Sequence, residues 1–349
     1  MIRRTLRAGF GILTATTLAA NGVVLAGSPF AQPYRDRTKA ELTVALDKEL
    51  QTALTTEVAE AKLASALDNG ETDEALAILR LADGRGVAIS NDLRQSIARA
   101  EEAATGWSTC IACAISAENC PDLTRVAACN LPVELTPIGD AKAITRALTD
   151  YLAGNDIDRI DLALGVIGLG STVAILASGG SSATIKLGAT TLRVARKTGA
   201  ISARLMGEIT TAARGALKLE NARAVVRGTK PMSSLIDAAR AAKLTTLASD
   251  MGRLSKALPP GEALAMLRLA DSAPELTRIA RVAETAGSET RGTFAVLGKA
   301  RVLRVAQRLT EAALLALSLL IALAGQLLLI LLWWFKRLAR GQGRKAKPS

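Results

Sequence analysis

Histidine is absent from this chain of 349 residues, and aromatic residues make up only 3% of it. The absence of histidine excludes the usual catalytic triads, the commonest general base and every zinc site built from cysteine and histidine. The hydrophobic residues, 49% of the chain, are therefore mainly Ala, Leu, Val and Ile, which favours helices over β-sandwiches. We expect an all-α protein, a multi-helix bundle, with no bound metal and no cofactor.

The first residues have the pattern of an export signal. Three arginines within the first seven residues precede a mostly apolar stretch from Ala8 to Ala26, and small residues follow it. This order is typical of a secretory signal peptide, with cleavage after Ala26 or Ala31. We assign residues 1–31 to this signal. The alternative is an uncleaved N-terminal anchor, and either one would export the residues that follow.

The C-terminal part predicts a transmembrane helix. Residues 312–335 contain no charged residue in 24 positions, enough for a helix to cross about 30 Å of hydrocarbon. Residues 336–349 carry six basic residues and no acidic one, so the positive-inside rule places them in the cytoplasm. A buried core helix is the alternative. The membrane-interface anchors that we expect are Trp333, Trp334, Lys336, Arg337 and Arg340.

A second apolar stretch, from Leu162 to Ile185, lies in the middle of the chain. A single crossing there would reverse the last helix and put its cations on the outer side, so the positive-inside rule favours no crossing or a hairpin. Gly179-Gly180 divides the stretch into segments too short for a full hairpin. We therefore favour two buried helices over a hairpin that inserts into a membrane.

Charge is distributed unevenly along the chain. Residues 35–160 contain 13 basic and 21 acidic residues, whereas residues 186–256 contain 14 basic and 4 acidic ones. The simplest consequence is that the two parts face each other. The alternatives are a contact of the basic part with anionic headgroups or another acidic envelope polymer, and a merely solvated set of helix faces. Export argues against a nucleic acid partner.

The four cysteines of the chain are Cys110, Cys113, Cys120 and Cys129. In an oxidising compartment this spacing predicts two local disulfides. A helix that begins at Pro121 would hold Cys120 and Cys129 roughly 13 Å apart, beyond disulfide reach. Of the two remaining pairings we favour the nested one, with Cys113–Cys120 inside Cys110–Cys129. A metal or iron–sulfur site with four thiolates lacks the usual paired spacing, and no βαβ pattern supports a redox role for the Cys110-x-x-Cys113 pair.

The helix signals along the chain are clear. We predict one amphipathic helix from Thr38 to about Leu67, closed by Asn69-Gly70, and a second helix capped by Thr72. From about Glu289 the chain contains only isolated glycines as breakers. This pattern predicts one long helix that continues into the membrane span.

A ten-residue segment occurs twice with nine identities. Residues 74–83 read EALAILRLAD, and residues 262–271 read EALAMLRLAD. Such an internal repeat indicates a duplicated two-helix unit. Each copy would need a partner to bury its leucine-rich face. Chance similarity between Ala/Leu-rich helices is the alternative.

Signatures of enzymes are weak. The run Gly165-Val-Ile-Gly168-Leu-Gly170-Ser-Thr-Val173 begins like a dinucleotide loop, but Val173 stands in place of the third glycine of the G-x-G-x-x-G pattern, and helical sequence precedes the run. A cluster of acids, Asp156, Asp158 and Asp161, could bind a cation, but helix capping and a solvated helix start explain it better. Residues 137–199 are faintly similar to helical pre-toxin segments of secreted polymorphic toxins. The similarity covers only this stretch, where no toxin domain follows, and no residue roles are transferred from it.

Five regions follow from these patterns. They are a signal peptide (1–31), an acidic helical region with four cysteines (32–137), a basic helical region with a central apolar hairpin (138–311), a transmembrane helix (312–335) and a basic cytoplasmic tail (336–349). We expect a single-pass protein of the bacterial inner membrane that lies mostly in the periplasm. Its expected function is non-enzymatic, as an interaction or envelope-scaffold module with an envelope protein partner. The alternative is a membrane-active, pore-forming or toxin-like protein that inserts residues 162–185.

Overall fold

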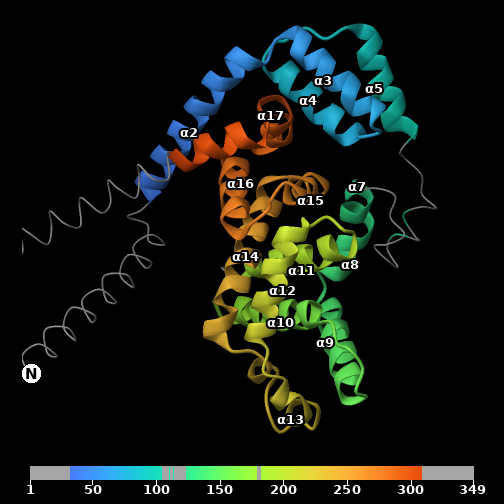
Figure 1. Cartoon of the computed structure of the whole chain (residues 1–349), viewed down its shortest axis with the longest axis vertical. Helices are drawn as coiled ribbons and strands as arrows, with labels where there is room; N and C mark the ends of the chain where they lie inside the picture. Colours follow the sequence, from blue (N-terminus) through green and yellow to red (C-terminus); the bar gives the residue numbers. More distant parts are fainter. Residues whose placement is uncertain (1–31, 104–109, 111–112, 114–122, 179–181, 309–349) are drawn as a thin grey trace, which may run out of the picture. The chain divides into compact units, whose positions relative to one another are not determined.

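The computed structural model describes residues 32–103, 110, 113, 123–178 and 182–308, which are predominantly helical (Figure 1). Within these ranges there is no β-strand, only an isolated antiparallel bridge between Leu217 and Ile236. The prediction of an all-α protein is therefore confirmed. The described residues fall into two compact units, 32–44 with 305–308 and 45–304, and the packing described below is that of residues 45–304.

The helices follow one another with short connections. The N-terminal helices are α2 (Gln32–Ala53), α3 (Thr56–Asp68), α4 (Thr72–Gly84) and α5 (Asn91–Ala103). The middle of the chain forms α7 (Leu123–Arg125), the π-helical turn η3 (Val126–Asn130), α8 (Leu131–Glu134), α9 (Pro137–Leu152), α10 (Arg159–Ser178), α11 (Ala183–Lys197), α12 (Ala203–Ala216), η4 (Leu219–Asn221), α13 (Ala222–Val226) and η5 (Met232–Leu235). The last described elements are α14 (Ala238–Ala257), α15 (Pro260–Arg268), α16 (Ala273–Ala286), η6 (Gly287–Glu289) and α17 (Thr290–Leu297).

Side-chain caps explain where several helices begin. The hydroxyl of Thr55 accepts a hydrogen bond from the Val58 amide at 3.2 Å and starts α3, so the single helix predicted from Thr38 to Leu67 is wrong. The prediction missed this break because only a local capping bond marks it. The break at Asn69-Gly70 was predicted correctly. Thr72 begins α4 but is not its cap, because the capping position is Glu71, which makes no side-chain capping bond.

The predicted long helix from Glu289 onward is also wrong. α17 ends at Leu297 because Gly298 adopts φ +79°, a left-handed conformation that glycine reaches without steric cost. A separate helical segment then covers residues 299–308. The predicted transmembrane helix, residues 312–335, lies outside the described residues.

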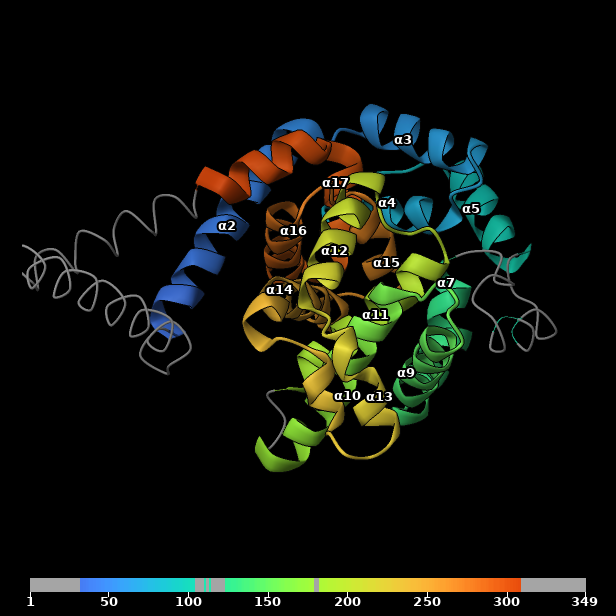
Figure 2. The same cartoon turned by 60° about the horizontal axis from the view of Figure 1, so that its bottom comes forward.

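Helix α11 lies at the centre of the packing and contacts both α14 and α10 (Figure 2). α11 and α14 cross closely because each contributes a glycine at the crossing. A Cβ atom on Gly188 would overlap the carbonyl oxygen of Ala248, and one on Gly252 would overlap that of Thr184. The two backbones therefore touch directly, in the manner of helix pairs with small residues at the interface.

The central apolar stretch forms most of α10 and the start of α11, as predicted. Leu162, Leu164 and Val166 of α10 are buried, and α10 packs on α9, α11 and α12. In the part of the chain that the structure describes, no helix has both the length and the apolar character needed to cross a membrane.

The glycine crossing leads to a first prediction. Gly188→Ala should lower the free energy of unfolding by about 1–3 kcal/mol, because the added methyl group forces α11 away from α14. Gly207→Ala is the matched control, since Gly207 lies within α12 with nothing within 4 Å of the added carbon. We expect it to stabilise the protein by about 0.5–1 kcal/mol through helix propensity. Urea denaturation of both variants provides the test, and equal effects would show that the crossing tolerates a side chain.

Candidate functional site: a buried charge network

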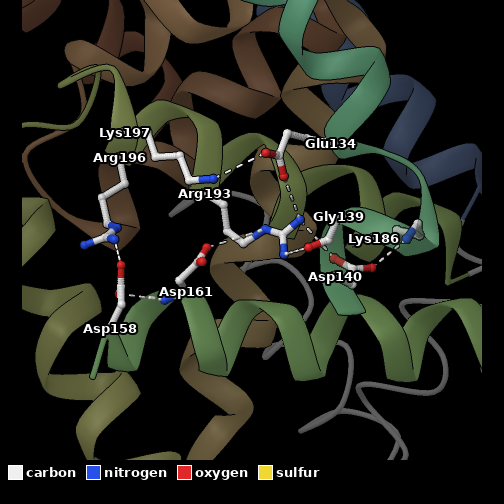
Figure 3. A network of polar contacts seen from close by, with 9 residues as sticks. All are labelled: Glu134, Gly139, Asp140, Asp158, Asp161, Lys186, Arg193, Arg196 and Lys197. Carbon is white, nitrogen blue, oxygen red and sulfur yellow. Dashed lines mark hydrogen bonds and ion pairs between the residues drawn. The ribbon is translucent and has the colours of Figure 1, made fainter. Parts of the chain in front are cut away.

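A network of buried charges joins helices α8, α9, α10 and α11 (Figure 3). Four cations and four carboxylates take part, so the charges balance within the network. We call it the charge network, and its members are Glu134, Asp140, Asp158, Asp161, Lys186, Arg193, Arg196 and Lys197.

Arg193 of α11 is the centre of the charge network, with a side chain only 1% exposed. Its Nη2 atom lies 3.0 Å from Oδ1 of Asp140 and 3.5 Å from Oε2 of Glu134. Its Nε atom lies 3.9 Å from Oδ1 of Asp161, and Nη1 donates to the carbonyl of Gly139 at 3.4 Å. Three carboxylates from three different helices therefore surround one guanidinium group.

Asp140 is completely buried between two cations. Its Oδ2 atom lies 2.6 Å from Nζ of Lys186, and its Oδ1 atom faces Arg193. Lys186 and Arg193 are two helical turns apart and therefore lie on the same face of α11. Asp140 also occupies the first turn of α9, where the helix dipole stabilises a negative charge.

The outer part of the charge network is more exposed. Lys197 lies 3.3 Å from Glu134, and Arg196 pairs with Asp158. Oδ1 of Asp158 also accepts a hydrogen bond of 2.9 Å from the Asp161 amide at the start of α10. Burial lowers the pKa of Arg196.

The glycines that resemble a dinucleotide loop make room for this arrangement. Gly165 and Gly168 lie inside α10, on the side that faces α9. A Cβ atom on Gly168 would come within 2.8 Å of Oδ1 of Asp140, and one on Gly165 within 3.3 Å of Ile144. The glycine pattern therefore serves helix packing, which agrees with the rejection of a nucleotide-binding loop.

The acid cluster near residue 160 is divided between two roles. Asp158 caps α10 as predicted, and Asp156 is exposed. The prediction of a solvated helix start is wrong for Asp161, which is buried because α11 brings Arg193 over it. Among the described residues, no group of three or more acidic or cysteine side chains could hold a metal ion.

Sequence reasoning treated Lys186 and Arg193 only as part of a basic stretch and missed their role. Two features of the sequence could have indicated that these charges are buried. Lys186 and Arg193 lie on one face of the helix together with small residues, and single acidic residues stand next to apolar runs. The acidic and the basic part meet here only where they adjoin: α11 supplies the cations, and residues 134–161 supply the carboxylates.

The outer bond of the nested cysteine pairing is confirmed. Cys110 and Cys129 form a disulfide with Cα atoms 5.5 Å apart. Cys113 is also disulfide-bonded, while Cys120 lies outside the described residues. The expected helix after Pro121 is present from Leu123 and passes through the π-helical turn that carries Cys129.

The two repeated segments, residues 74–83 and 262–271, contribute to α4 and α15. Each of these helices is followed by a second helix, α5 or α16. Equivalent positions are buried in both, as Ala75 and Ala263 illustrate, and the equivalent arginines Arg80 and Arg268 are exposed. Arg80 also pairs with Glu262 of the other segment. The two segments therefore share a helical start and part of their burial, whereas Leu81 is buried within α4 and its counterpart Leu269 lies past the end of α15 and is only half-buried.

The membrane-interface anchors Trp333, Trp334, Lys336, Arg337 and Arg340 lie outside the described residues. Residues 1–31, assigned to the export signal, do so as well.

Comparison of the chain with protein-family models, with curated proteins and with solved structures gave no match. The chemistry of the site therefore rests on its geometry. Every charge in the network faces an opposite charge. Its effect is to hold α10 and α11 against α8 and α9.

The role of Arg193 leads to a second prediction. Arg193→Met should lower the free energy of unfolding by about 3–5 kcal/mol, because it leaves Asp161 buried without an ion-pair partner and Asp140 with Lys186 alone. Arg37→Met is the control: Arg37 is 81% exposed and pairs with Glu41, so we expect a change below about 1 kcal/mol.

Coupling within the network can be measured in the same denaturation experiment. The double variant Arg193→Met/Asp140→Asn should lose less stability than the sum of the two single variants, since each removes the same interaction. Additive losses would contradict a direct Arg193–Asp140 interaction.

A third prediction concerns the pH dependence of stability. Burial, and then the charge of Glu71, raise the pKa of Glu74 in α4. A raised carboxyl pKa in the folded state favours folding at low pH, and this contribution is lost as the pH rises through the folded pKa. Glu74→Gln should therefore stabilise the protein at pH 7 and have little effect at pH 4.

Glu60 provides a control of opposite sign. Its carboxylate accepts a hydrogen bond from the Ser90 amide at 2.8 Å, and this bond lowers its pKa. Glu60→Gln should therefore reduce stability at pH 7. Urea denaturation at both pH values would test the pair, and the same sign for both variants at pH 7 would contradict this account.

Proposed function

We propose that the protein is a membrane-anchored helical protein of the bacterial periplasm that acts through binding, as an interaction or envelope-scaffold module. In this proposal residues 312–335 form the anchor, the tail 336–349 lies in the cytoplasm, and residues 1–31 direct export. The duplicated two-helix unit, α4–α5 and α15–α16, belongs to the same proposal as part of the scaffold. Its binding partner is an envelope protein.

The observation that carries this proposal is the charge network. The apolar helix α10 and the basic helix α11 are fixed inside the helical domain by Arg193, Lys186 and their carboxylates. Insertion of this pair into a bilayer would separate these ions or carry them into hydrocarbon, and both are costly. A fixed domain suits a scaffold better than a protein that inserts its central hairpin.

The charges outside the network support a binding role. Several pair locally, as Lys243 does with Glu208 and Arg253 with Glu284. Other cations of the basic part are exposed and available to an acidic partner: Arg204, Arg214, Arg223, Arg227, Lys230 and Arg240. Together with the absence of histidine, this arrangement favours binding over catalysis.

Reporter fusions at Leu131, Lys230 and Ser349 test the topology in a fourth prediction. With alkaline phosphatase for the outer side and a fluorescent protein for the inner side, Leu131 and Lys230 should report outside and Ser349 inside. If Lys230 reports inside, the central apolar stretch crosses the membrane and the proposal fails.

Dye release separates the proposal from the membrane-active alternative. The full chain should release no dye from anionic vesicles. The variant Arg193→Met should release no more dye than a denatured sample of the chain. Release by the native chain that Gly170→Asp abolishes would favour a protein that inserts residues 162–185.

A further inference from the structure

Residues 217–236 form a closed loop that we call the α13 tip. The loop is closed at its base by the bridge between Leu217 and Ile236, where the Lys218 amide donates to the carbonyl of Leu235 at 2.8 Å. Beside it, the Asp237 amide donates to Ala216 at 2.8 Å. The α13 tip therefore begins and ends at the same place on the domain.

The interior of the α13 tip is ordered. The Asn221 side chain donates to the carbonyl of Ser234 at 2.7 Å and accepts from Lys230 at 2.6 Å. Ala222, Val225 and Leu235 are buried in one apolar cluster with side chains of α9 and α10. These residues hold the backbone of the loop in place from inside. We call the side of the loop that carries its exposed side chains the outer face.

Apolar side chains are exposed on that outer face. Val226 is 52% exposed and Met232 is 37% exposed, although their neighbours Val225 and Leu235 are buried. Leu152, 41% exposed, ends α9, which contacts α13, and both elements lie at the lower end of Figure 1. A single exposed Val is common on proteins, but Val226 and Met232 are both exposed on one closed loop, whose α13 contacts a helix that ends in a third exposed apolar side chain, and this combination indicates a contact surface.

Cations lie beside these apolar side chains. Arg223, Arg227 and Lys230 are exposed, and none of the three forms an ion pair with another described residue. The tip also carries the exposed acid Glu220, while its other cation, Lys218, pairs with Asp237 at 3.0 Å. The outer face thus combines an excess of positive charge with an exposed apolar centre.

We infer that the α13 tip docks onto the surface of an anionic lipid bilayer. Val226 and Met232 would enter the boundary between headgroups and acyl chains, while the three cations bind lipid phosphates. An acidic polypeptide without apolar side chains would use the cations but leave Val226 and Met232 without a partner. This inference concerns lipid contact by residues 217–236 and does not depend on the proposed anchor at residues 312–335.

The test uses the full chain kept in solution by an amphipathic polymer, with or without a membrane anchor, and vesicles are added to it. Vesicles that contain phosphatidylglycerol should slow amide hydrogen exchange in residues 222–236 at least several-fold, whereas phosphatidylcholine vesicles should leave it unchanged. The variant Arg223→Gln/Arg227→Gln/Lys230→Gln should lower the affinity for the anionic vesicles by roughly 100-fold, at about 1 kcal/mol for each cation near the surface.

Two further variants make the result specific. Lys62→Gln/Arg99→Gln/Arg268→Gln removes three exposed cations from other helices and should retain the protection. Val226→Ser/Met232→Ser keeps every cation and should weaken vesicle binding while leaving the binding of polyglutamate unchanged.

Three results would overturn the inference. One is exchange in residues 222–236 that does not respond to anionic vesicles. Another is equal protection by polyglutamate with no effect of Val226→Ser/Met232→Ser, which would identify a contact for acidic polypeptides. The third is equal weakening by both triple variants. The reporter fusions test the anchor separately, so either proposal can fail without the other.

Discussion

The contact between Arg193 and Asp140 is the interaction on which the arrangement of the central helices depends. Both side chains are fully buried, and each would be strongly destabilising alone, so α9 and α11 can pack only in the register that brings them together. Gly168 leaves the space for the Asp140 carboxylate, and Lys186 neutralises its second oxygen. Such a network adds little net stability compared with apolar side chains, but it penalises every other arrangement of the same helices.

Close backbone contact and buried charge complement each other around α11. On one side, Gly188 and Gly252 bring α11 against α14 without intervening side chains. On the other side, Arg193 reaches the carboxylates of α8, α9 and α10. A helix fixed on two sides in this way is poorly suited to leave the domain, and this physical constraint links the packing to the proposed scaffold role. The α13 tip differs, because it directs apolar and cationic side chains outward.

Much of the helical pattern could be predicted from the sequence, and the errors have physical causes. The break at Thr55 depends on one capping hydrogen bond, and the break at Gly298 on one left-handed residue; neither interrupts the apolar periodicity that predicted longer helices. A helix after Pro121 excluded one cysteine pairing and left two, of which the favoured one contains the observed Cys110–Cys129 bond. For the candidate site, the sequence showed an acidic part and a basic part, but not which charges are buried.

By itself, the sequence determined the helical class and the position of the central apolar helices, because these depend on composition and periodicity. It reduced the cysteine pairings to two, and the structure decided for the one that joins Cys110 to Cys129. Only the tertiary structure decided that Arg193, Asp140 and Asp161 meet, since they lie on three helices whose register no local signal specifies. It also decided which cations remain at the surface. Whether a charge pairs or stays exposed depends on its distance from residues far along the chain, and packing alone sets that distance.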